Sequence, residues 1–274
     1  MPSQAARIAQ HAVSILQREM QGSVAVLTLN RPEARNCLSE EMIALLHGSL
    51  KEIEVDKSVR AVVIAANGSA FCSGHDLRQM TAHRNDPDRG RAYFQQILNS
   101  CSAMMQAIVH LPQPVIAAVQ GIATAAGCQL VASCDLAVAS EAASFATPGV
   151  HIGLFCSTPM VALSRNLSRK HAMDMLLTGD PIPARRAQEI GLVNRVVAAG
   201  SERDAAIALA RQIASKSAHT LKVGKTAFYR QAEMNLANAY DYAAGVMTEN
   251  MLARDAEEGI SAFFEKREPK WRDE

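Results

Sequence analysis

Short apolar runs, many of them rich in β-branched residues, alternate with longer amphipathic stretches in the first half of the chain. The clearest runs are 24–29, 59–66, 114–119, 136–139 and 143–146. Runs of this kind are typical of the buried strands of a parallel sheet, because both faces of such a sheet are covered. The stretches 39–54 and 90–110 have helical spacing, and Ser39 is the expected N-cap of the first. The alternation predicts an α/β core with crossover connections.

Helical periodicity dominates the second part of the chain. From about residue 157 the expected helices are 158–166, 169–178, 184–190, 201–217, 219–229, 236–251 and 255–266. One late strand is expected over 192–197. Residues 82–91 are charged and contain Pro87, and we expect them to form a mobile loop. The pattern therefore predicts an α/β front followed by an α-helical back.

Length and composition narrow the class of protein. A chain of 274 residues can bury a sizeable core, and 49% apolar with 20% charged residues is unlike a disordered or fibrous protein. The formal net charge of +1, with no basic block, argues against a nucleic-acid partner. No apolar run approaches the ~20 residues of a membrane span, and residues 1–20 are helix-friendly without a secretory core. We expect a cytoplasmic protein with no membrane span.

Cysteine usage indicates core residues rather than disulfide or metal chemistry. The cysteines are Cys37, Cys72, Cys101, Cys128, Cys134 and Cys156. They lie in apolar or small-residue sequence without a C-x-x-C pair, which is typical of reduced thiols in an intracellular protein. The spacing of histidines and cysteines matches no metal-binding pattern, so we expect no metal site.

The stretch most suggestive of chemistry follows the strand at 114–119. This strand stops at Gly121, small residues continue to Gly127, and a helix-compatible run follows over 128–133. Small side chains let a ligand lie against the backbone, and the first N–H groups of a helix have no internal partner. Such a turn can polarise a carbonyl oxygen. Taken alone, it is more typical of a tight packed turn, and it lacks the G-x-G-x-x-G of a dinucleotide site.

A second stretch gives this turn a context. The strand at 62–66 is followed over 67–77 by N-G-S-A-F-C-S-G-H-D-L, and residues 113–121 read Q-P-V-I-A-A-V-Q-G. With these motifs the chain resembles the enoyl-CoA hydratase/isomerase (crotonase) superfamily. Further matching segments, in the family's order from about Gly22 to the C-terminus, begin at Asn30, Ser133, Phe145, Leu177 and Phe264.

The resemblance implies a fold, an assembly and a ligand. The fold would be an α/β, crotonase-like spiral of ββα units with a C-terminal helical trimerisation region, assembled as a homotrimer or a dimer of trimers. We accordingly divide the chain into an N-terminal helical extension (1–20), an acyl-CoA-binding core (21–200) and a C-terminal helical region (201–274). The implied ligand is a coenzyme A thioester of a fatty acid, with no further cofactor.

The resemblance also implies an oxyanion hole made of backbone N–H groups. In the family these belong to the residue before the Asp of G-x-D and to the small-residue turn, which here are His75 and Ala126. Two convergent donors would polarise the thioester carbonyl, where negative charge develops. Alanine at 125 and 126, where many relatives have glycine, is compatible with this role if the backbone stays helical. The residues implied to contact acyl-CoA are Ala34, Asn36, Ser73, Gly74, His75, Asp76, Leu77, Ala125, Ala126, Pro148 and Lys266.

The chain departs from the family at its catalytic acids. Hydratases carry one glutamate just after the small-residue turn and another in a later P-E-x-x-x-G, but these positions are Gln129 and Gly149 here. Hydration needs a base to activate water and an acid to protonate the α-carbon. An amide and a glycine supply neither, so we predict that standard hydration is lost. If the scaffold is otherwise intact, Gln129→Glu with Gly149→Glu should restore some of it.

Other side chains offer alternative roles. His75 is the first candidate for remaining acid–base chemistry and His151 the second, whereas Cys156 would need a lowered pKa to act as a nucleophile. Packing, turn or capping roles stay open for Asn36, His75, Asp76, Asp135, His151 and Cys156. Two functional hypotheses follow. The protein is either an enzyme of altered chemistry, such as isomerisation or thioester hydrolysis, or a non-catalytic acyl-CoA sensor or assembly partner.

Overall fold

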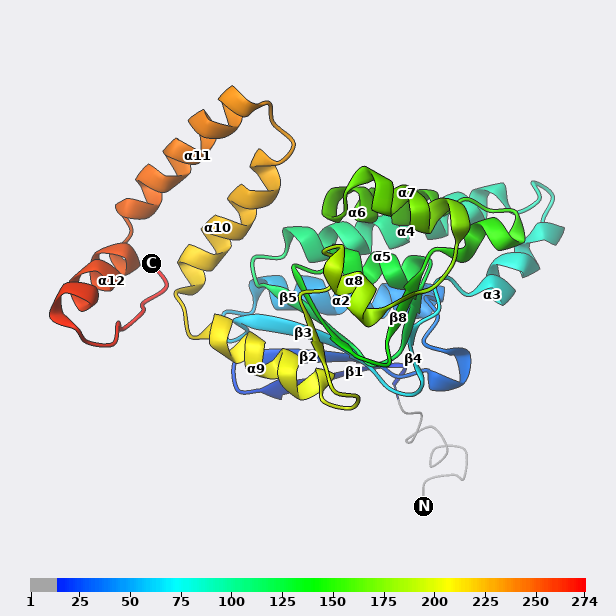
Figure 1. The fold of residues 1–274 in the computed structure, drawn as a ribbon, viewed down its shortest axis with the longest axis horizontal. Coiled ribbons are helices and arrows are strands. Elements are labelled where there is room, and N and C mark those ends of the chain that lie inside the picture. The colour runs from blue at the N-terminus through cyan, green and yellow to red at the C-terminus, as the bar shows by residue number, and fades with distance from the viewer. Residues whose placement is uncertain (1–13) are drawn as a thin grey trace, which may run out of the picture.

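A mostly parallel sheet forms the centre of the protein, for which a computed structural model describes residues 14–274 (Figure 1). The strand order is β1-β2-β3-β5-β7-β10. The strands are β1 (Leu16–Gln21), β2 (Val24–Leu29), β3 (Ala61–Ala66), β5 (Val115–Val119), β7 (Leu136–Ser140) and β10 (Arg195–Val197). Neighbouring strands are parallel except β1 and β2. The apolar runs thus form the buried parallel strands that their composition predicts.

A smaller sheet lies beside the large one and has the order β4-β6-β8-β9. Its strands are β4 (Ala70–Cys72), β6 (Ile122–Thr124), β8 (Ser144–Ala146) and β9 (Ile182–Pro183). After each of β3, β5 and β7, the next strand belongs to the small sheet, and a helix then follows. This repeated passage confirms the predicted spiral of ββα units.

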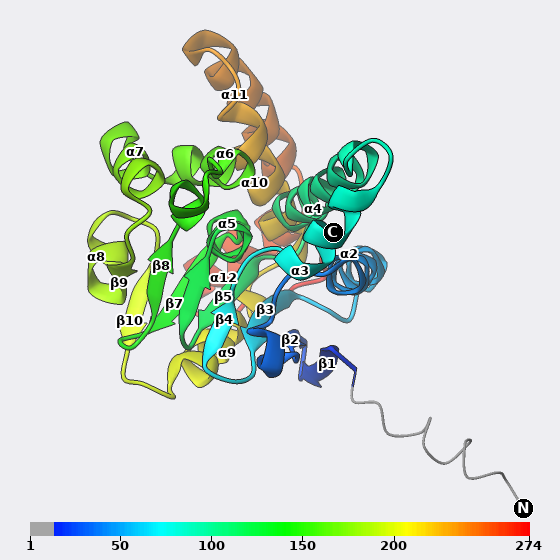
Figure 2. The same cartoon turned by 90° about the vertical axis from the view of Figure 1, so that its right-hand side faces the viewer.

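Helices cover both faces of the large sheet (Figure 2). The helices of this part of the chain, only some of which contact the large sheet, are α2 (Glu40–Val55), α3 (Leu77–Ala82), α4 (Arg91–His110), α5 (Ala126–Ser133), α6 (Ser157–Asn166), α7 (Arg169–Thr178), α8 (Ala184–Glu189) and α9 (Glu202–Ala214). Short 3-10 turns are η2 (Pro32–Ala34), η3 (His83–Asn85) and η4 (Pro148–Ile152). The main core lies between the sheet and α2, α4 and α5, and a second core lies under α9 on the opposite face.

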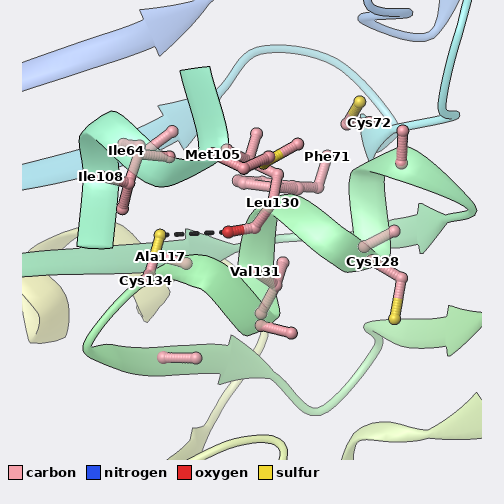
Figure 3. Close-up of a cluster of buried hydrophobic side chains, with 14 of the residues drawn as sticks. Ile64, Phe71, Cys72, Met105, Ile108, Ala117, Cys128, Leu130, Val131 and Cys134 are labelled. Atoms are coloured by element: carbon pink, nitrogen blue, oxygen red, sulfur yellow. Dashed lines mark hydrogen bonds between the residues drawn. The ribbon is translucent and has the colours of Figure 1, made fainter. Parts of the chain in front are cut away.

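Helix α5 crosses the main core and brings its first turn to the small sheet (Figure 3). Leu130 and Val131 of α5 pack with Met105 of α4 and Phe71 of β4 in one buried cluster. The six cysteines are all buried and unpaired, as predicted for core residues. Because every residue of α5 is buried, the position of its N-terminus is fixed by packing on all sides.

The C-terminal helices extend away from the sheets, as Figure 1 shows. They are α10 (Ala218–Gln231), α11 (Leu236–Met251) and α12 (Arg254–Glu265). The predicted C-terminal helical region is therefore present. Within residues 14–274, no helix combines the length and apolarity needed to cross a membrane.

The expected N-terminal helix needs correction where it is described. Residues 1–13 lie outside the described part of the chain, and Leu16–Gln21 forms strand β1 rather than a helix. A two-residue turn at Gly22 and Ser23 joins β1 to β2, with Gly22 at a left-handed φ of 69°. Pairing with β2 overrides the local helix preference, because the backbone of this polar segment forms the hydrogen bonds of an edge strand with β2.

Candidate functional site

The turn from β6 into α5 is built on close backbone approach. A Cβ at Gly121 would overlap the carbonyl of Ser69, and a Cβ at Gly127 would overlap the carbonyl of Cys72. Glycine is therefore required at both positions to dock β6 and α5 on β4. These contacts confirm that the stretch is a tightly packed turn. They do not exclude a ligand that binds at the same turn.

The loop after β4 lies directly against the start of α5. A Cβ built on Gly74 would be 3.0 Å from the Ala125 Cβ and 3.3 Å from the Ala126 backbone nitrogen. Leu38 fixes this loop from the other side, since its N–H donates to the Gly74 carbonyl (2.8 Å) and its carbonyl accepts from the Asp76 N–H (3.3 Å). The fold therefore brings together the two predicted loops.

The N–H groups of His75 and Ala126 both lack a hydrogen-bond partner in the part of the chain from 14 to 274. Ala126 is the first residue of α5, so its N–H has no acceptor inside the helix. His75 and Leu38 form a parallel β-bridge whose hydrogen bonds are made by Gly74 and Asp76, the residues on either side of His75. The N–H of His75 itself therefore points away from Leu38. These are the two donors that the sequence predicted, and they can polarise a carbonyl oxygen placed between their loops.

The backbone at Ala125 departs from the helical conformation that we expected. Ala125 has φ 50° and ψ −118°, a region that glycine tolerates and alanine does not, whereas Ala126 is helical. Ala125 donates its N–H to the Ala146 carbonyl (2.9 Å), and its own carbonyl accepts from the Gln129 N–H (3.0 Å). The expectation thus holds at Ala126 and fails at Ala125, where the surrounding hydrogen bonds enforce a strained turn.

The two positions of the missing glutamates differ in the space they offer. Gln129 is buried, and its Oε1 has no partner among the described residues. A Cβ on Gly149, in η4, would lie 2.7 Å from the Leu154 carbonyl oxygen and 2.9 Å from Cys156 Sγ. Leu154 and Cys156 therefore fill the space that a side chain at position 149 would need. Because the scaffold is not intact at this position, we do not expect Gln129→Glu with Gly149→Glu to restore hydration.

The alternative acid–base candidates fall into distinct environments. Both ring nitrogens of His75 are buried and form no hydrogen bond within residues 14–274, and burial lowers the pKa of its imidazole against an opposing backbone contact with Leu38. His151 is exposed, and its Nε2 is hydrogen-bonded to the Thr178 carbonyl at 2.8 Å. Burial raises the pKa of the Cys156 thiol, so it is not an activated nucleophile. His75 remains the side chain best suited to proton transfer.

Asn36 and Asp76 are committed to the loop itself. The Asn36 side chain accepts from the Arg31 N–H (2.8 Å) and donates to the carbonyls of Asn67 and Ala70 (both 2.8 Å). Asp76 caps α3 and pairs with Arg31 at 3.2 Å. Burial alone would raise the pKa of Asp76, but hydrogen bonds from the Gln79 N–H, the Cys37 thiol and Arg31 lower it. Both side chains therefore shape the site.

The remaining predicted residues divide between the site and the C-terminal region. Ala34 ends η2, Ser73 and Leu77 flank the Gly74 loop, and Pro148 begins η4. Lys266 is the C-cap of α12, which Figure 1 shows far from α3 and α5. Within one protomer Lys266 is thus not part of the site.

Two exposed arginines, which the sequence analysis did not single out, are adjacent in sequence to the predicted contact residues. Arg35 and Arg78 are exposed, and neither forms a salt bridge within residues 14–274. Each is adjacent in sequence to predicted contact residues, Arg35 between Ala34 and Asn36 and Arg78 directly after Leu77. Their place in the sequence could have identified them as candidate ligand contacts. A guanidinium without an acidic partner is suited to bind phosphate or carboxylate.

Comparison with known proteins gives a consistent assignment. The family model described as "Enoyl-CoA hydratase/isomerase" matches residues 19–274. Human "Enoyl-CoA hydratase domain-containing protein 3, mitochondrial" is 43% identical over 93% of this chain and 82% of its own length. The Xenopus laevis protein of the same name is 43% identical over 96% of this chain and 87% of its own length.

Solved structures agree. A crystal structure of an enoyl-CoA hydratase from Mycobacterium smegmatis has a TM-score of 0.90 at 50% identity, covering 94% of this chain and 99% of that one. The crystal structure of human enoyl-CoA hydratase domain-containing protein 3 has a TM-score of 0.89 at 42% identity, covering 94% and 100%. The resemblance found in the sequence is thereby confirmed.

The cytoplasmic location expected from the sequence is contradicted. The relatives from Homo sapiens and Xenopus laevis carry the word mitochondrial in their names, as do those from rat, mouse and zebrafish. Composition and the lack of a secretory core do not separate these compartments, which is why the sequence argument failed.

Proposed function

The chain belongs to the enoyl-CoA hydratase/isomerase family, and on that premise we propose that it binds acyl-CoA thioesters and holds their carbonyl oxygen between the N–H groups of His75 and Ala126. The observation that carries the proposal is a pair of backbone donors that have no acceptor among residues 14–274 and lie on loops that touch at Gly74. Preorganised donors of this kind stabilise charge on a thioester oxygen without any side-chain chemistry.

In this proposal the protein does not add water to enoyl thioesters. The Gln129 carboxamide does not act as an acid or a base at neutral pH. The space beside Gly149 is filled by the Leu154 carbonyl and Cys156 Sγ. General acid–base catalysis contributes about 10²–10⁴-fold in rate, and both groups that supply it in hydratases are replaced. Carbonyl polarisation alone leaves an acyl-CoA-binding protein.

The coenzyme A portion of the ligand would lie along the Gly74 loop. Arg35 and Arg78 would meet its phosphates, since both guanidiniums are exposed beside that loop and free of salt bridges within residues 14–274. Asn36 and Asp76 would act indirectly, by holding the loop in place.

We also propose assembly into a homotrimer or a dimer of trimers through the C-terminal helices. Large apolar side chains of α11 and α12 face solvent in the single chain, among them Leu236 (75% exposed), Phe263 (79%) and Phe264 (75%). Apolar surface of this extent is typical of a contact between subunits. Such a contact would bring Lys266 close to a neighbouring subunit.

A second candidate function is an enzyme of altered chemistry, favoured by His75. Burial lowers the pKa of its imidazole and favours the neutral form, and in this candidate function the ring would exchange a proton with a ligand held in the hole. His75→Ala separates the candidates, since lost turnover with retained binding indicates the enzyme. If wild type and His75→Ala bind the thioester equally and neither converts it, the protein is the sensor or assembly partner.

Calorimetry with Gly74→Ala tests the oxyanion hole. A methyl group at Gly74 would lie 3.3 Å from the Ala126 nitrogen and would separate the two loops. We expect this variant to bind butyryl-CoA about tenfold more weakly than wild type, with a smaller loss of affinity for free coenzyme A, which has no thioester carbonyl for the hole to hold. Gly48→Ala in α2 is the control, because nothing lies within 4 Å of its Cβ position. Equal losses for butyryl-CoA and free coenzyme A would contradict the proposal.

A further inference from the structure

We propose that a shallow pocket between η3 and the first turns of α4 is a binding site for a phosphate monoester. The pocket has a volume of about 440 Å³ and opens to solvent. Its lining is formed by Arg84, Asp88, Arg89, Arg91, Phe94, Gln95 and Leu98. None of these residues belongs to the predicted acyl-CoA site, so the inference goes beyond the proposed function and does not rest on it.

Three guanidiniums in this pocket have no acidic partner. Arg84, Arg89 and Arg91 are exposed, and none of them forms a salt bridge or a side-chain hydrogen bond within residues 14–274. Like charges that line one pocket repel one another, so an anion that binds among them lowers their electrostatic free energy. The planar fork of a guanidinium also matches phosphate oxygens, which it can bind with two parallel N–H groups.

The two carboxylates of the same segment are already occupied. Asp86 is hydrogen-bonded to the His83 ring at 2.8 Å. Asp88 accepts the N–H groups of Gly90 (2.9 Å) and Ala92 (2.8 Å) at the start of α4. Neither carboxylate therefore pairs with an arginine of the pocket. The three guanidiniums and the one carboxylate of the lining leave a formal charge of +2. A phosphate monoester matches this charge, because it carries about −1.5 to −2 at pH 7.

Local packing holds this part of the chain in place before a ligand binds. The Arg84 guanidinium lies over the Phe94 ring, 5.7 Å from its centroid. A Cβ on Gly90 would lie 2.8 Å from both the His83 carbonyl oxygen and Phe94 Cζ, so glycine is what lets η3 pack against α4. Arg89 has a left-handed φ of 60°, which is uncommon outside glycine and is enriched at ligand sites. A preorganised site loses less conformational entropy when it binds.

The lining favours a phosphate monoester over a carboxylate. A terminal phosphate offers three oxygens to three guanidiniums, whereas a carboxylate offers two oxygens and a single charge. Phe94 and Leu98 line the same pocket and provide an apolar wall for the carbon portion of the ligand. The same monoester occurs in small soluble metabolites and in the lipid phosphatidate, so the experiment has an arm for each source.

Calorimetry with glycerol 3-phosphate tests the soluble source. The full-length protein is titrated at about 0.15 M salt, and glycerol is the probe that lacks the phosphate. We expect glycerol 3-phosphate to bind with a dissociation constant of about 1 mM or tighter, and glycerol not to bind. Cosedimentation with vesicles tests the lipid source. Phosphatidylcholine vesicles that contain phosphatidate are compared with vesicles that contain phosphatidylglycerol, a phosphate diester, at equal lipid charge. Binding of either monoester supports the site and identifies its source.

Two double variants assign the binding to the pocket. Arg84→Gln combined with Arg89→Gln removes two of the three guanidiniums, and we expect it to bind the monoester at least about tenfold more weakly than wild type. Arg169→Gln combined with Arg185→Gln is the matched control. Both of these arginines are exposed, and neither forms a salt bridge within residues 14–274. This control removes the same charge from another part of the surface and should stay within about twofold of wild type.

The results that would overturn the site are distinct. The first is the absence of binding in both arms. The second is equal sedimentation with phosphatidate and phosphatidylglycerol vesicles when glycerol 3-phosphate does not bind. An equal loss of affinity in the two double variants would show attraction to charge in general, and it would also overturn the site. Displacement of the bound monoester by saturating butyryl-CoA would show that these arginines serve the acyl-CoA site instead.

Discussion

At the scale of single residues, the strained backbone of Ala125 sets the position of the Ala126 N–H. Its φ of 50° and ψ of −118° belong to a region where glycine is strongly preferred. Hydrogen bonds to Ala146 and Gln129 hold the conformation on both sides. The alanine at this position therefore stores strain next to a proposed binding group.

Replacing Ala125 with glycine should relieve that strain. We expect Ala125→Gly to raise the free energy of unfolding by about 1 kcal/mol in urea denaturation. The neighbouring Ala126→Gly is the control, because its helical backbone should make glycine destabilising by about 0.5–1 kcal/mol. Destabilisation by both substitutions would show that Ala125 is not strained.

Gly149 is a second residue at which a local contact decides the outcome. The Leu154 carbonyl and Cys156 Sγ occupy the space of its missing side chain. We expect Gly149→Ala to lower the free energy of unfolding by about 1–3 kcal/mol through overpacking. Gly149→Glu should be worse, so the double variant with Gln129→Glu should recover no hydration. Gly48→Ala, in open space within α2, should be neutral or stabilising.

Crotonyl-CoA hydration by the double variant, at the stability of wild type, would contradict this view of Gly149. The replacement of both glutamates is visible in the sequence, but the closure over Gly149 depends on the path of the chain through residues 154–156. Likewise, the buried bonds of Asn36 depend on Asn67 and Ala70, which are distant in sequence.

At the scale of elements, α10 is attached to the core by a largely buried ionic cluster. Lys225 Nζ donates to the carbonyls of Ile108 and Gln113 (both 3.1 Å) and to Asp135 (2.7 Å). Tyr229 donates to the other Asp135 oxygen at 2.8 Å. Asp135 is therefore the structural residue that the sequence suggested, placed just before β7, and it connects the C-terminal helices to the sheet.

Breaking this cluster should loosen the C-terminal helices. We expect Lys225→Met to lower the free energy of unfolding by about 3 kcal/mol, because it leaves the Asp135 carboxylate without its cation. Lys222→Met on the exposed face of the same helix should change it by less than about 0.5 kcal/mol. Equal effects of the two substitutions in denaturation would rule out an anchoring role for Lys225.

The elements themselves followed largely from hydrophobic patterning. The parallel strands and most helices were predicted because their apolar periodicity coincides with their burial. Strand β1 was not predicted, because four of its six side chains are exposed and its sequence has no apolar alternation. Its strand conformation depends on pairing with β2. The amides of His75 and Ala126 could be located from motifs because backbone donors depend on the path of the chain and not on side-chain identity.

At the scale of the whole molecule, the C-terminal helices expose an apolar surface that a single chain does not cover. Phe263 and Phe264 pack edge to face on each other, with ring centroids 5.7 Å apart, and both remain exposed. An assembly would bury them, and it would move the molecule from one chain mass to three or six.

Light scattering after size exclusion measures this directly. We expect three or six chain masses for the wild-type protein and a lower mass for Phe263→Ser combined with Phe264→Ser, since polar side chains remove the apolar contact. Val55→Ser, at the end of α2 and 79% exposed, is the matched control and should leave the mass unchanged. A monomeric wild-type protein at micromolar concentration would refute the assembly.

The most direct test of the central claim is mass spectrometry of crotonyl-CoA after incubation with the purified protein. We propose that the thioester binds at the N–H groups of His75 and Ala126, where neither of the two glutamates that activate water in hydratases is present. We therefore expect crotonyl-CoA to be recovered without a product heavier by one water. A hydrated product whose formation Gly74→Ala abolishes would contradict the account, because it would show that the same oxyanion hole still supports hydration without either glutamate.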